Sequence, residues 1–533
     1  MNYILILLVS FVFSQNFIYN SDDWFTISNP GYITSIATTK DEVIISAKNG
    51  VYSYNKYTQE FLFIEDFVRK FNSNSYYMIH YDNYRDYLWI LTDENLSFKP
   101  MSSNFWREID FYELNLNNHY NILNIGCSAE YLFLNVGSEF IVLNPYTGSI
   151  VTDEVDGYSD IDWTGSSRNI LSHNFDLSRF HSYEGYNFIS NSQIEYNGRF
   201  LDITAITLDD NYLWVGTNSG EIFLCDLSLR NAEKIKSMPL FSDLKISYLD
   251  ERMEWWFATN DLITMYDDFI LRKDQIFMLR WIEDENKWIS YNQKKYQHIR
   301  SSDITCFYRS DKNLYVGTYH GLLIFNINRK KWILLSSVSD NLKSDHILDL
   351  EFYNNQLFIA TKSGIDVISI SDNIMIKNDI LSQLDGLIIQ EIKIKDDNMF
   401  ILSDTGLFKY NIILKEMYSL INDNFKNMIL VDKNNFLLTK RNKVLNYNIN
   451  KNEKNTLVQI KNIKDIAKCE NYIWINVNRK VILYDMTKKV SFEYDSKDGI
   501  TGDMINQVDC DENWVWFTTD KGMSFFNWNK YHE

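Results

Sequence analysis

The stretch Tyr212–Leu227 (YLWVGTNSGEIFLCDL) decides the fold, because close copies of it recur along the chain. Leu314–Ile327 reads LYVGTYHGLLIFNI, and Val515–Asn527 reads VWFTTDKGMSFFN. Each copy has a run of aromatic and β-branched residues, a short turn and a second apolar run, a pattern typical of a β-hairpin. Gly220 stands in the turn, where a residue that tolerates positive φ is needed. The repeated unit is therefore predicted to be a hairpin.

Setting Thr217 in register with its copies shows how regularly the hairpin recurs. The equivalent positions are Ala47, Thr92, Val136, Thr217, Thr259, Thr318, Thr361, Ser403, Thr439, Val477 and Thr519. Most successive positions are 36 to 45 residues apart, the spacing of four-stranded propeller blades. The longer interval before Thr217 has room for one degenerate unit around Tyr186–Tyr196. The sequence thus predicts an all-β chain, a β-propeller of about twelve four-stranded blades.

Two Trp-headed segments bear on how the blades divide into rings. Trp24–Ser28 opens the chain as a lone strand, and Trp288–Tyr291 follows the long interval after Thr259. We interpret Trp24–Ser28 as the fourth strand of the Thr259 blade and Trp288–Tyr291 as the fourth strand of the Thr519 blade. This predicts two six-bladed propellers in tandem. A single ring of twelve, or seven blades plus five, would leave the two strands unexplained.

The N-terminus, MNYILILLVSFVFSQN, has the pattern of a secretory signal peptide. Its apolar run Ile4–Phe13 is too short to cross a bilayer, and the small residues Val12 and Ser14 suit the −3 and −1 positions of a cleavage site. The flank lacks Lys and Arg, and a buried first strand is the alternative. The predicted organisation is a signal peptide over 1–15, a first propeller over 16–267, a link over 268–286 and a second propeller over 287–533.

Charge limits the classes of partner. The 533 residues carry a formal net charge of −19, and no basic stripe is evident that could neutralise phosphates. This argues against binding to nucleic acid or to an anionic membrane surface. We expect no membrane-spanning segment and no cofactor.

The cysteines are odd in number and widely spaced, and no CxxC occurs. We therefore expect packed thiols, and neither a disulfide framework nor a metal site. The five residues are Cys127, Cys225, Cys306, Cys469 and Cys510.

The repeat resembles a known family. LWVGTNSG, LYVGTYHGLLIFN and DGITGDMINQVDCDENWVWFTTDKGMSFFN are similar to the repeats of two-component-regulator-type β-propellers. That family includes extracytoplasmic sensor domains and propeller proteins associated with type IX secretion. The resemblance implies an exported propeller that either senses a ligand or works in an envelope assembly.

Candidate binding residues should lie at the mouth of the central channel, where the first strand of each blade begins. For the second propeller these are Asp303, His346, Gln390, Asn427, Asp465 and Asn506. The set is polar but mixed, and it lacks the repeated His or paired carboxylates that a metal-dependent lyase would need.

The densest acidic segment offers a weaker candidate. Carboxylates at short spacing could hold Ca²⁺, although the spacing does not match an EF-hand and a solvated loop is favoured. They could also supply the acid and base of a glycosidase. The calcium candidates are Asp153, Asp156, Asp160 and Asp162.

Without a catalytic signature, the sequence predicts an exported, non-catalytic binding or scaffold protein. Its partners would be proteins of the cell envelope, with a saccharide as a second ligand class. Its location would be periplasmic, outer-membrane associated or extracellular. The alternatives are a ligand-sensing module that acts through a separate partner, and a carbohydrate-active lyase or glycosidase at a channel mouth.

Overall fold

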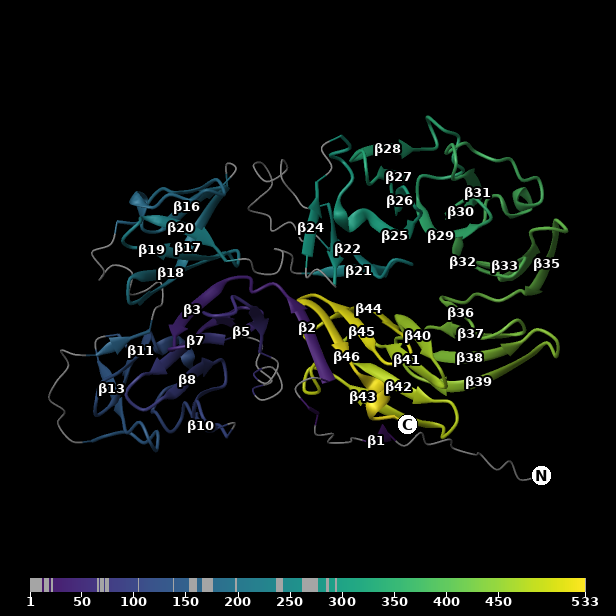
Figure 1. Cartoon of the computed structure of the whole chain (residues 1–533). Coiled ribbons are helices and arrows are strands. Elements are labelled where there is room, and N and C mark those ends of the chain that lie inside the picture. Colours follow the sequence, from purple (N-terminus) through teal and green to yellow (C-terminus); the bar gives the residue numbers. More distant parts are fainter. Residues whose placement is uncertain are drawn as a thin grey trace, which may run out of the picture. The chain divides into compact units, whose positions relative to one another are not determined.

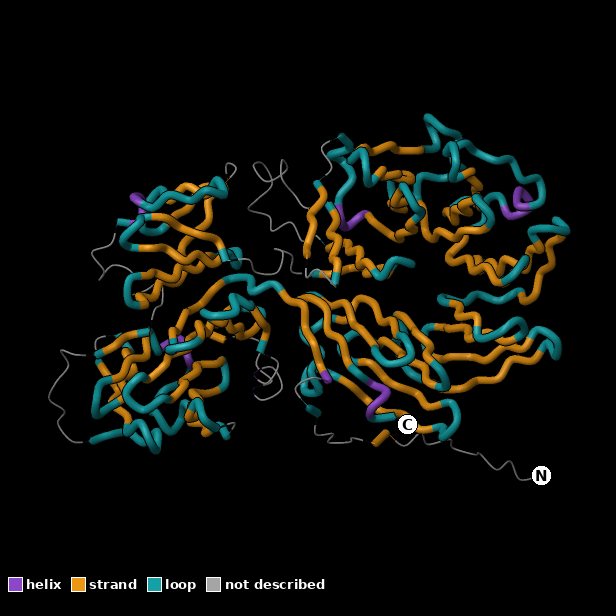
Figure 2. Tube along the Cα trace, viewed as in Figure 1, coloured by secondary structure: helices purple, strands orange, loops and turns teal. Residues whose placement is uncertain are grey.

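The computed structural model describes residues 12–13, 19–20, 23–64, 67, 71, 76–103, 105–137, 139–152, 161–164, 176–196, 199–235, 243–260, 277–283, 287–292 and 295–532. These residues form antiparallel β-sheets joined by turns, with short 3₁₀ helices (Figure 2). The all-β propeller class is therefore confirmed. The chain divides into two compact units. The N-terminal unit comprises 24–242 and 496–502, and the C-terminal unit comprises 1–23, 243–495 and 503–533.

Seven sheets of the C-terminal unit follow one another in sequence order (Figure 1). Their strands are β21 (Leu244–Leu249), β22 (Glu254–Thr259), β23 (Met278–Ile282) and β24 (Lys287–Tyr291); β25 (Ile304–Arg309), β26 (Asn313–Thr318), β27 (Gly321–Asn326) and β28 (Lys331–Leu335); β29 (Ile347–Tyr353), β30 (Gln356–Thr361) and β31 (Gly364–Ser369); β32 (Ile389–Lys395), β33 (Asn398–Ser403), β34 (Leu407–Asn411) and β35 (Glu416–Ile421); β36 (Met428–Leu430), β37 (Asn435–Lys440), β38 (Lys443–Asn448) and β39 (Glu453–Gln459); β40 (Asp465–Cys469), β41 (Tyr472–Asn476), β42 (Val481–Asp485) and β43 (Val490–Tyr494); and β44 (Ile505–Cys510), β45 (Val515–Thr519) and β46 (Gly522–Phe526).

The first strands of these sheets form the inside of a closed ring. β25 contacts β29, β29 contacts β32, and β40 contacts β44. Apolar clusters join β33 to β37 and β37 to β40. The ring closes between the first sheet and the last, where the Ser247 amide donates to Gln507 Oε1 at 2.8 Å and Trp255 meets Trp516 edge-on at 5.2 Å. Closure leaves no first or last sheet with an unpacked face.

The predicted six-plus-six division is wrong for this ring. Trp255 of β22 pairs with Trp281 of β23, which pairs with Trp288 of β24. The Trp288 strand therefore completes the blade of Thr259, and the predicted link at 268–286 falls inside that blade. By composition, LITMYD (262–267) is the expected third strand of this unit; it lies outside the described residues, and β23 holds the third place in the sheet. The Trp281 and Trp288 rings stack at 5.4 Å. The predicted arrangement, which assigns the Trp288 strand to the Thr519 blade, lacks this contact.

The N-terminal chain meets the last blade of the C-terminal unit. The Asp23 carbonyl accepts from the Asn527 amide at 2.8 Å, and the Tyr19 ring packs edge-on against Phe526 at 5.4 Å. Trp24–Ser28 is a strand (β2) as predicted, but the Thr259 blade already has four strands without it. Within the predicted signal peptide, Val12–Phe13 (β1) pairs in parallel with β43, and the rest lies outside the described residues.

The N-terminal unit contains four sheets of the same kind. Their strands are β3 (Ile33–Thr38), β4 (Glu42–Ala47), β5 (Gly50–Asn55) and β6 (Phe61–Phe63); β7 (Tyr76–Asp82), β8 (Tyr87–Thr92), β9 (Asn95–Pro100) and β10 (Arg107–Asp110); β11 (Asn124–Cys127), β12 (Leu132–Asn135), β13 (Phe140–Leu143) and β14 (Asp162–Trp163); and β15 (Tyr186–Phe188), β16 (Gln193–Tyr196), β17 (Arg199–Asp209), β18 (Tyr212–Thr217), β19 (Ile222–Asp226) and β20 (Asn231–Lys234). The degenerate unit at Tyr186–Tyr196 forms β15 and β16, which extend the sheet of β17–β20.

Five short 3₁₀ helices complete the secondary structure of the described residues. They are η2 (His119–Asn121), η4 (Leu177–Arg179), η6 (Ser301–Asp303), η7 (Leu381–Leu384) and η8 (Trp528–Lys530).

The repeated Thr and Gly have a structural role at the hairpin turns. The buried Thr318 hydroxyl donates to the Gly321 carbonyl at 2.7 Å, and Thr361 donates to Gly364 at 2.8 Å. Gly321 has φ +120°, and a Cβ there would lie 2.5 Å from the Leu335 carbonyl oxygen. The repeat phrase therefore specifies a turn, which answers why the chain repeats it.

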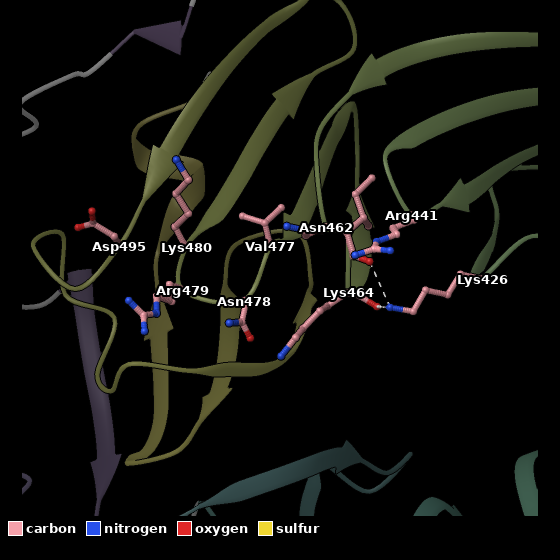
Figure 3. Close-up of a pocket in the computed structure, with 10 residues that line it drawn as sticks. Lys426, Arg441, Asn462, Lys464, Val477, Asn478, Arg479, Lys480 and Asp495 are labelled. Carbon is pink, nitrogen blue, oxygen red and sulfur yellow. Dashed lines mark hydrogen bonds between the residues drawn. The ribbon is translucent and has the colours of Figure 1, made fainter.

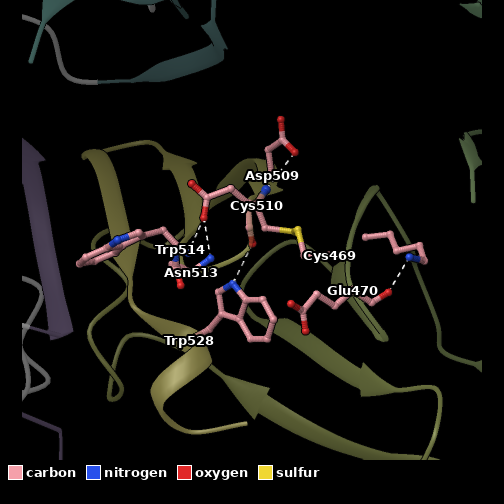
Figure 4. The surroundings of a disulfide bond; sticks show 9 residues. Cys469, Glu470, Asp509, Cys510, Asn513, Trp514 and Trp528 are labelled. Carbon is pink, nitrogen blue, oxygen red and sulfur yellow. Dashed lines mark hydrogen bonds between the residues drawn. A yellow bond between two sulfur atoms is a disulfide. The ribbon is translucent and has the colours of Figure 1, made fainter. Parts of the chain in front are cut away.

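The cysteine prediction is wrong for one pair. Cys469 at the end of β40 and Cys510 at the end of β44 form a disulfide, with their Cα atoms 6.1 Å apart (Figure 4). Wide sequence spacing does not exclude a bond here, because the ring sets the inner strands of neighbouring blades side by side. Cys127 and Cys225 are buried thiols as predicted, and Cys306 is a half-buried thiol.

Candidate functional site

All six channel-mouth candidates lie near the starts of inner strands of the C-terminal ring. We call this side of the ring the mouth face; it also carries the turns between second and third strands. Asp303 ends η6 before β25, and His346 and Asn427 directly precede β29 and β36. Gln390, Asp465 and Asn506 are the second, first and second residues of β32, β40 and β44. A ligand-binding role for this set stays a prediction.

Two of these side chains join neighbouring blades. The Asp465 carboxylate accepts from the amide of Val508 on β44 at 3.1 Å. The Asn506 side-chain amide donates to Asp243 Oδ1 at 2.8 Å, which links the last blade to the first. Gln390 Oε1 is buried and has no hydrogen-bond partner within the described part of the chain. The Asp465 and Asn506 side chains therefore stabilise the ring, because buried polar groups need partners.

The other three lie on the same face with different surroundings. Asp303 Oδ2 is 3.6 Å from His320 Nε2. The His346 ring lies 4.3 Å from the Tyr319 ring, and burial lowers the pKa of His346. Asn427 Oδ1 accepts from a neighbouring threonine hydroxyl at 2.9 Å. No group of three His, Cys, Asp or Glu side chains that could hold a metal ion occurs among the described residues.

Sequence reasoning missed all members but one, Asp465, of a set of charged residues deeper in the channel, which we call the channel cluster. Lys393 Nζ lies 3.6 Å from Asp349 Oδ2 and 3.8 Å from Glu391 Oε1. Burial raises the pKa of Asp509 to about 6, and the Lys393 charge opposes part of that rise, although β32 and β44 belong to non-adjacent sheets. This influence across the ring indicates that the two side chains face the central channel. The members of the cluster are Asp349, Glu351, Glu391, Lys393, Asp465 and Asp509.

The carboxylates of the channel cluster bridge to the next blade. Asp349 accepts from the amide of Ile392 at 2.9 Å, and Glu391 accepts from the amide of Met428 at 2.8 Å. Burial raises the pKa of Glu391 to about 7 and that of Asp465 to about 6. Asp349, followed by Glu391, raises the pKa of Lys393. The cluster holds neighbouring blades together and also places titratable carboxylates near neutrality.

We expect Glu391→Gln to stabilise the protein at pH 8 by about 1–2 kcal/mol, a value discounted for water in the channel. A raised carboxyl pKa means that folding favours the protonated acid, so stability falls as pH rises from about 4 to about 7. The uncharged variant escapes that loss. Its melting temperature should exceed that of the parent at pH 8 and match it near pH 5. The exposed Glu512→Gln is the control, and an equal difference at every pH would contradict the explanation.

An open pocket of about 750 Å³ lies at the mouth face, between the sheets of β36–β39 and β40–β43 (Figure 3). We call it the basic pocket. Its lining residues come from turns before β36 and β40, from the β37–β38 and β41–β42 turns, and from the end of β43: Lys426, Arg441, Asn462, Ile463, Lys464, Val477, Asn478, Arg479, Lys480 and Asp495. Five cations face one carboxylate there. No sequence pattern indicates this pocket, because the cations come together only when two blades are adjacent.

Of the calcium candidates, the structure describes one. Asp162 lies on β14 opposite Cys127 of β11. Burial, with the nearby Asp82 charge, raises the pKa of Asp162. Asp153, Asp156 and Asp160 lie outside the described residues, so the calcium site stays a prediction.

Comparison with known proteins gives similarity in fold. No protein-family profile and no curated protein sequence matches the chain. PorZ, a surface component of the type IX secretion system of Porphyromonas gingivalis, superposes with a TM-score of 0.50 at 11% identity, over 95% of this chain and 87% of PorZ. The chain shares its β-propeller fold.

Extracellular domains of B. thetaiotaomicron are also similar. One, assigned to a hybrid two-component system, has a TM-score of 0.42 at 15% identity, and the match covers 93% of this chain and 75% of the B. thetaiotaomicron chain. Another from the same organism has a TM-score of 0.43 at 13% identity, with the same coverage of both chains. The likeness to PorZ confirms the resemblance as one of fold. None of the helices in the described residues has the length and apolar character to cross a membrane.

Proposed function

We propose that the protein is exported and acts as a non-catalytic binding or scaffold protein of the cell envelope, which presents the mouth face to protein partners. The main observation in support of this proposal is the basic pocket, which is open at the mouth face. Most carboxylates of the channel cluster, in contrast, accept backbone amides of the ring. The apolar N-terminus supports export. The Cys469–Cys510 disulfide supports it too, because such bonds persist in oxidising compartments.

Residues 1–15 would be removed on export, and the mature protein would be periplasmic, outer-membrane associated or extracellular. The type IX surface role printed for PorZ is compatible with this proposal. A ligand-sensing module that acts through a separate partner is the alternative to the scaffold.

The proposal predicts a specific crosslink from the mouth face in the native envelope. Tyr319 lies in the β26–β27 turn on that face and is 40% exposed. A photoreactive amino acid at position 319 should give a discrete higher-mass adduct on illumination. The same amino acid at Tyr418, which is exposed on the outer strand β35, is the control and should give none. Absence of an adduct from position 319 would count against the scaffold.

One observation favours a second candidate, a carbohydrate-active hydrolase or lyase in the channel. Burial raises the pKa of Glu391 to about 7, and the nearby Asp349 charge adds to that rise, which suits a proton donor. Assays of reducing ends and of unsaturated uronates on a polysaccharide panel would test it. Activity that disappears in Glu391→Gln would support the enzyme, and no activity on any substrate would count against it.

A further inference from the structure

We propose that the basic pocket binds an acidic peptide segment of a partner protein, so that aspartate and glutamate side chains are the groups recognised. This inference rests on the proposed function and specifies the chemistry of the partner. It starts from a contrast in charge. The whole chain has a formal net charge of −19, yet the pocket is lined by five cations and one carboxylate.

Three of the cations are available to a ligand. Arg441, Lys464 and Arg479 make no side-chain hydrogen bond or ion pair among the residues that the structure describes. Lys480, in contrast, pairs with Glu493 at 2.6 Å. Within the described residues, Asp495 and the Lys480–Glu493 pair offset only part of the cost of gathering these like charges, and an anion in the pocket would relieve the rest.

The remaining cation is rigidly placed. Lys426 Nζ donates to the carbonyls of Ile463 and Lys464, at 3.1 Å and 2.8 Å. These carbonyls orient the ammonium without neutralising it, and burial lowers its pKa. Figure 3 shows the cations spread across the pocket, with Arg479 and Lys480 at one end and Arg441 and Lys426 at the other. Several separated anionic groups fit this layout better than a single compact one.

The other lining groups favour a peptide. Asn478 Oδ1 is a buried acceptor with no partner in the described part of the chain, so the ligand should donate a hydrogen bond there. A peptide backbone supplies N–H groups beside its carboxylates, whereas phosphate at neutral pH is chiefly an acceptor. Val477, which is partly exposed, gives apolar surface for side-chain methylenes. Guanidinium groups such as that of Arg479 bind carboxylates in a bidentate manner.

The negative charge of the rest of the protein favours a short anionic ligand over an extended one. An extended anionic surface would bring many like charges close to the protein. A short flexible peptide meets mainly the pocket, because charges further away than about 8–10 Å are screened at physiological salt. A membrane or a nucleic acid is therefore a poorer fit than a peptide.

Fluorescence anisotropy of a labelled hexaglutamate peptide on the full-length protein tests the proposal. Arg441→Glu with Arg479→Glu should weaken binding by at least about tenfold, since each charged hydrogen bond contributes substantially. The matched control reverses two exposed lysines in third-to-fourth-strand turns, Lys415→Glu with Lys451→Glu, and should change the affinity less than about twofold. Melting temperatures of both variants check that they fold. Parental binding should weaken as salt rises.

Three results would overturn the inference: no peptide binding to the parent at low salt, parental affinity in the pocket variant, or tighter binding of oligogalacturonate or tripolyphosphate than of the peptide. The crosslink from Tyr319 separates this failure from failure of the proposed function. Suppose that the pocket variant still gives the adduct and that the parent does not bind the peptide. The proposed scaffold function would then be retained, and only the proposal that the partner presents an acidic segment would be rejected.

Discussion

Replacing Cys469 and Cys510 together by serine should lower the free energy of unfolding of the C-terminal ring by about 2–5 kcal/mol. The disulfide spans a sequence separation of 41 residues, for which the chain-entropy model gives about 4 kcal/mol. It joins β40 to β44, the inner strands of the last two blades. Without the disulfide, the unfolded chain is less constrained, so unfolding gains more conformational entropy. The melting temperature in thermal unfolding measures the effect.

The reductant sensitivity of the parent gives an independent check. Dithiothreitol should lower the melting temperature of the parent toward that of the double variant and leave the variant unchanged. Cys306→Ser is the control, because it replaces a thiol of the same unit that is not in a disulfide. A parent that melts at the same temperature with and without reductant would show that the bond is not formed.

The fold was predictable because the repeat places the same interaction at a regular spacing. Thr318 and Gly321 specify a turn by a hydrogen bond within four residues, and local patterns of this kind are readable in one sequence. The division into rings depends on which strand pairs with which. Trp281 stacks on Trp288, but LITMYD is an equally good strand by composition. Periodicity cannot choose between two candidates for one place in a sheet.

On β29, β32, β40 and β44 the predicted candidate lies within three residues of a member of the channel cluster. The candidate His346 correctly marked the start of β29, but the channel charge lies at Asp349. A β-bulge between Ile347 and Asp349 shifts the pairing register there, and the same shift precedes Glu391 in β32. Alternation in ILDLEF and IQEIKIK was the available signal, because every second residue is charged or polar. The basic pocket had no such signal, since its cations are contributed by separate turns.

Replacing Asp23 by alanine should lower the free energy of unfolding of the C-terminal ring by about 2–3 kcal/mol. The Asp23 side chain is fully buried and lies 2.7 Å from Lys530 Nζ. It also accepts from the Tyr531 hydroxyl and from the Asn20 amide, the latter at 2.8 Å. Asp23 therefore ties the N-terminal chain to the segment that follows the last blade. The estimate stays below the upper range for buried pairs because Lys530 is 51% exposed and can be rehydrated.

The pH dependence of this loss identifies its cause. Burial alone would raise the pKa of Asp23, but hydrogen bonds from Lys530 and Tyr531 outweigh it, so the pKa lies below its ordinary value. A lowered carboxyl pKa gives stability that is present above about pH 4 and is lost as pH falls through the folded-state pKa. The difference between parent and Asp23→Ala should therefore shrink in acid. The control is Asp379→Ala, which removes an exposed carboxylate that pairs with the exposed Lys377. This substitution should lower the free energy of unfolding by less than about 0.5 kcal/mol. If the Asp23 loss were the same at pH 3 as at pH 7, packing rather than charge would connect the two ends of the chain.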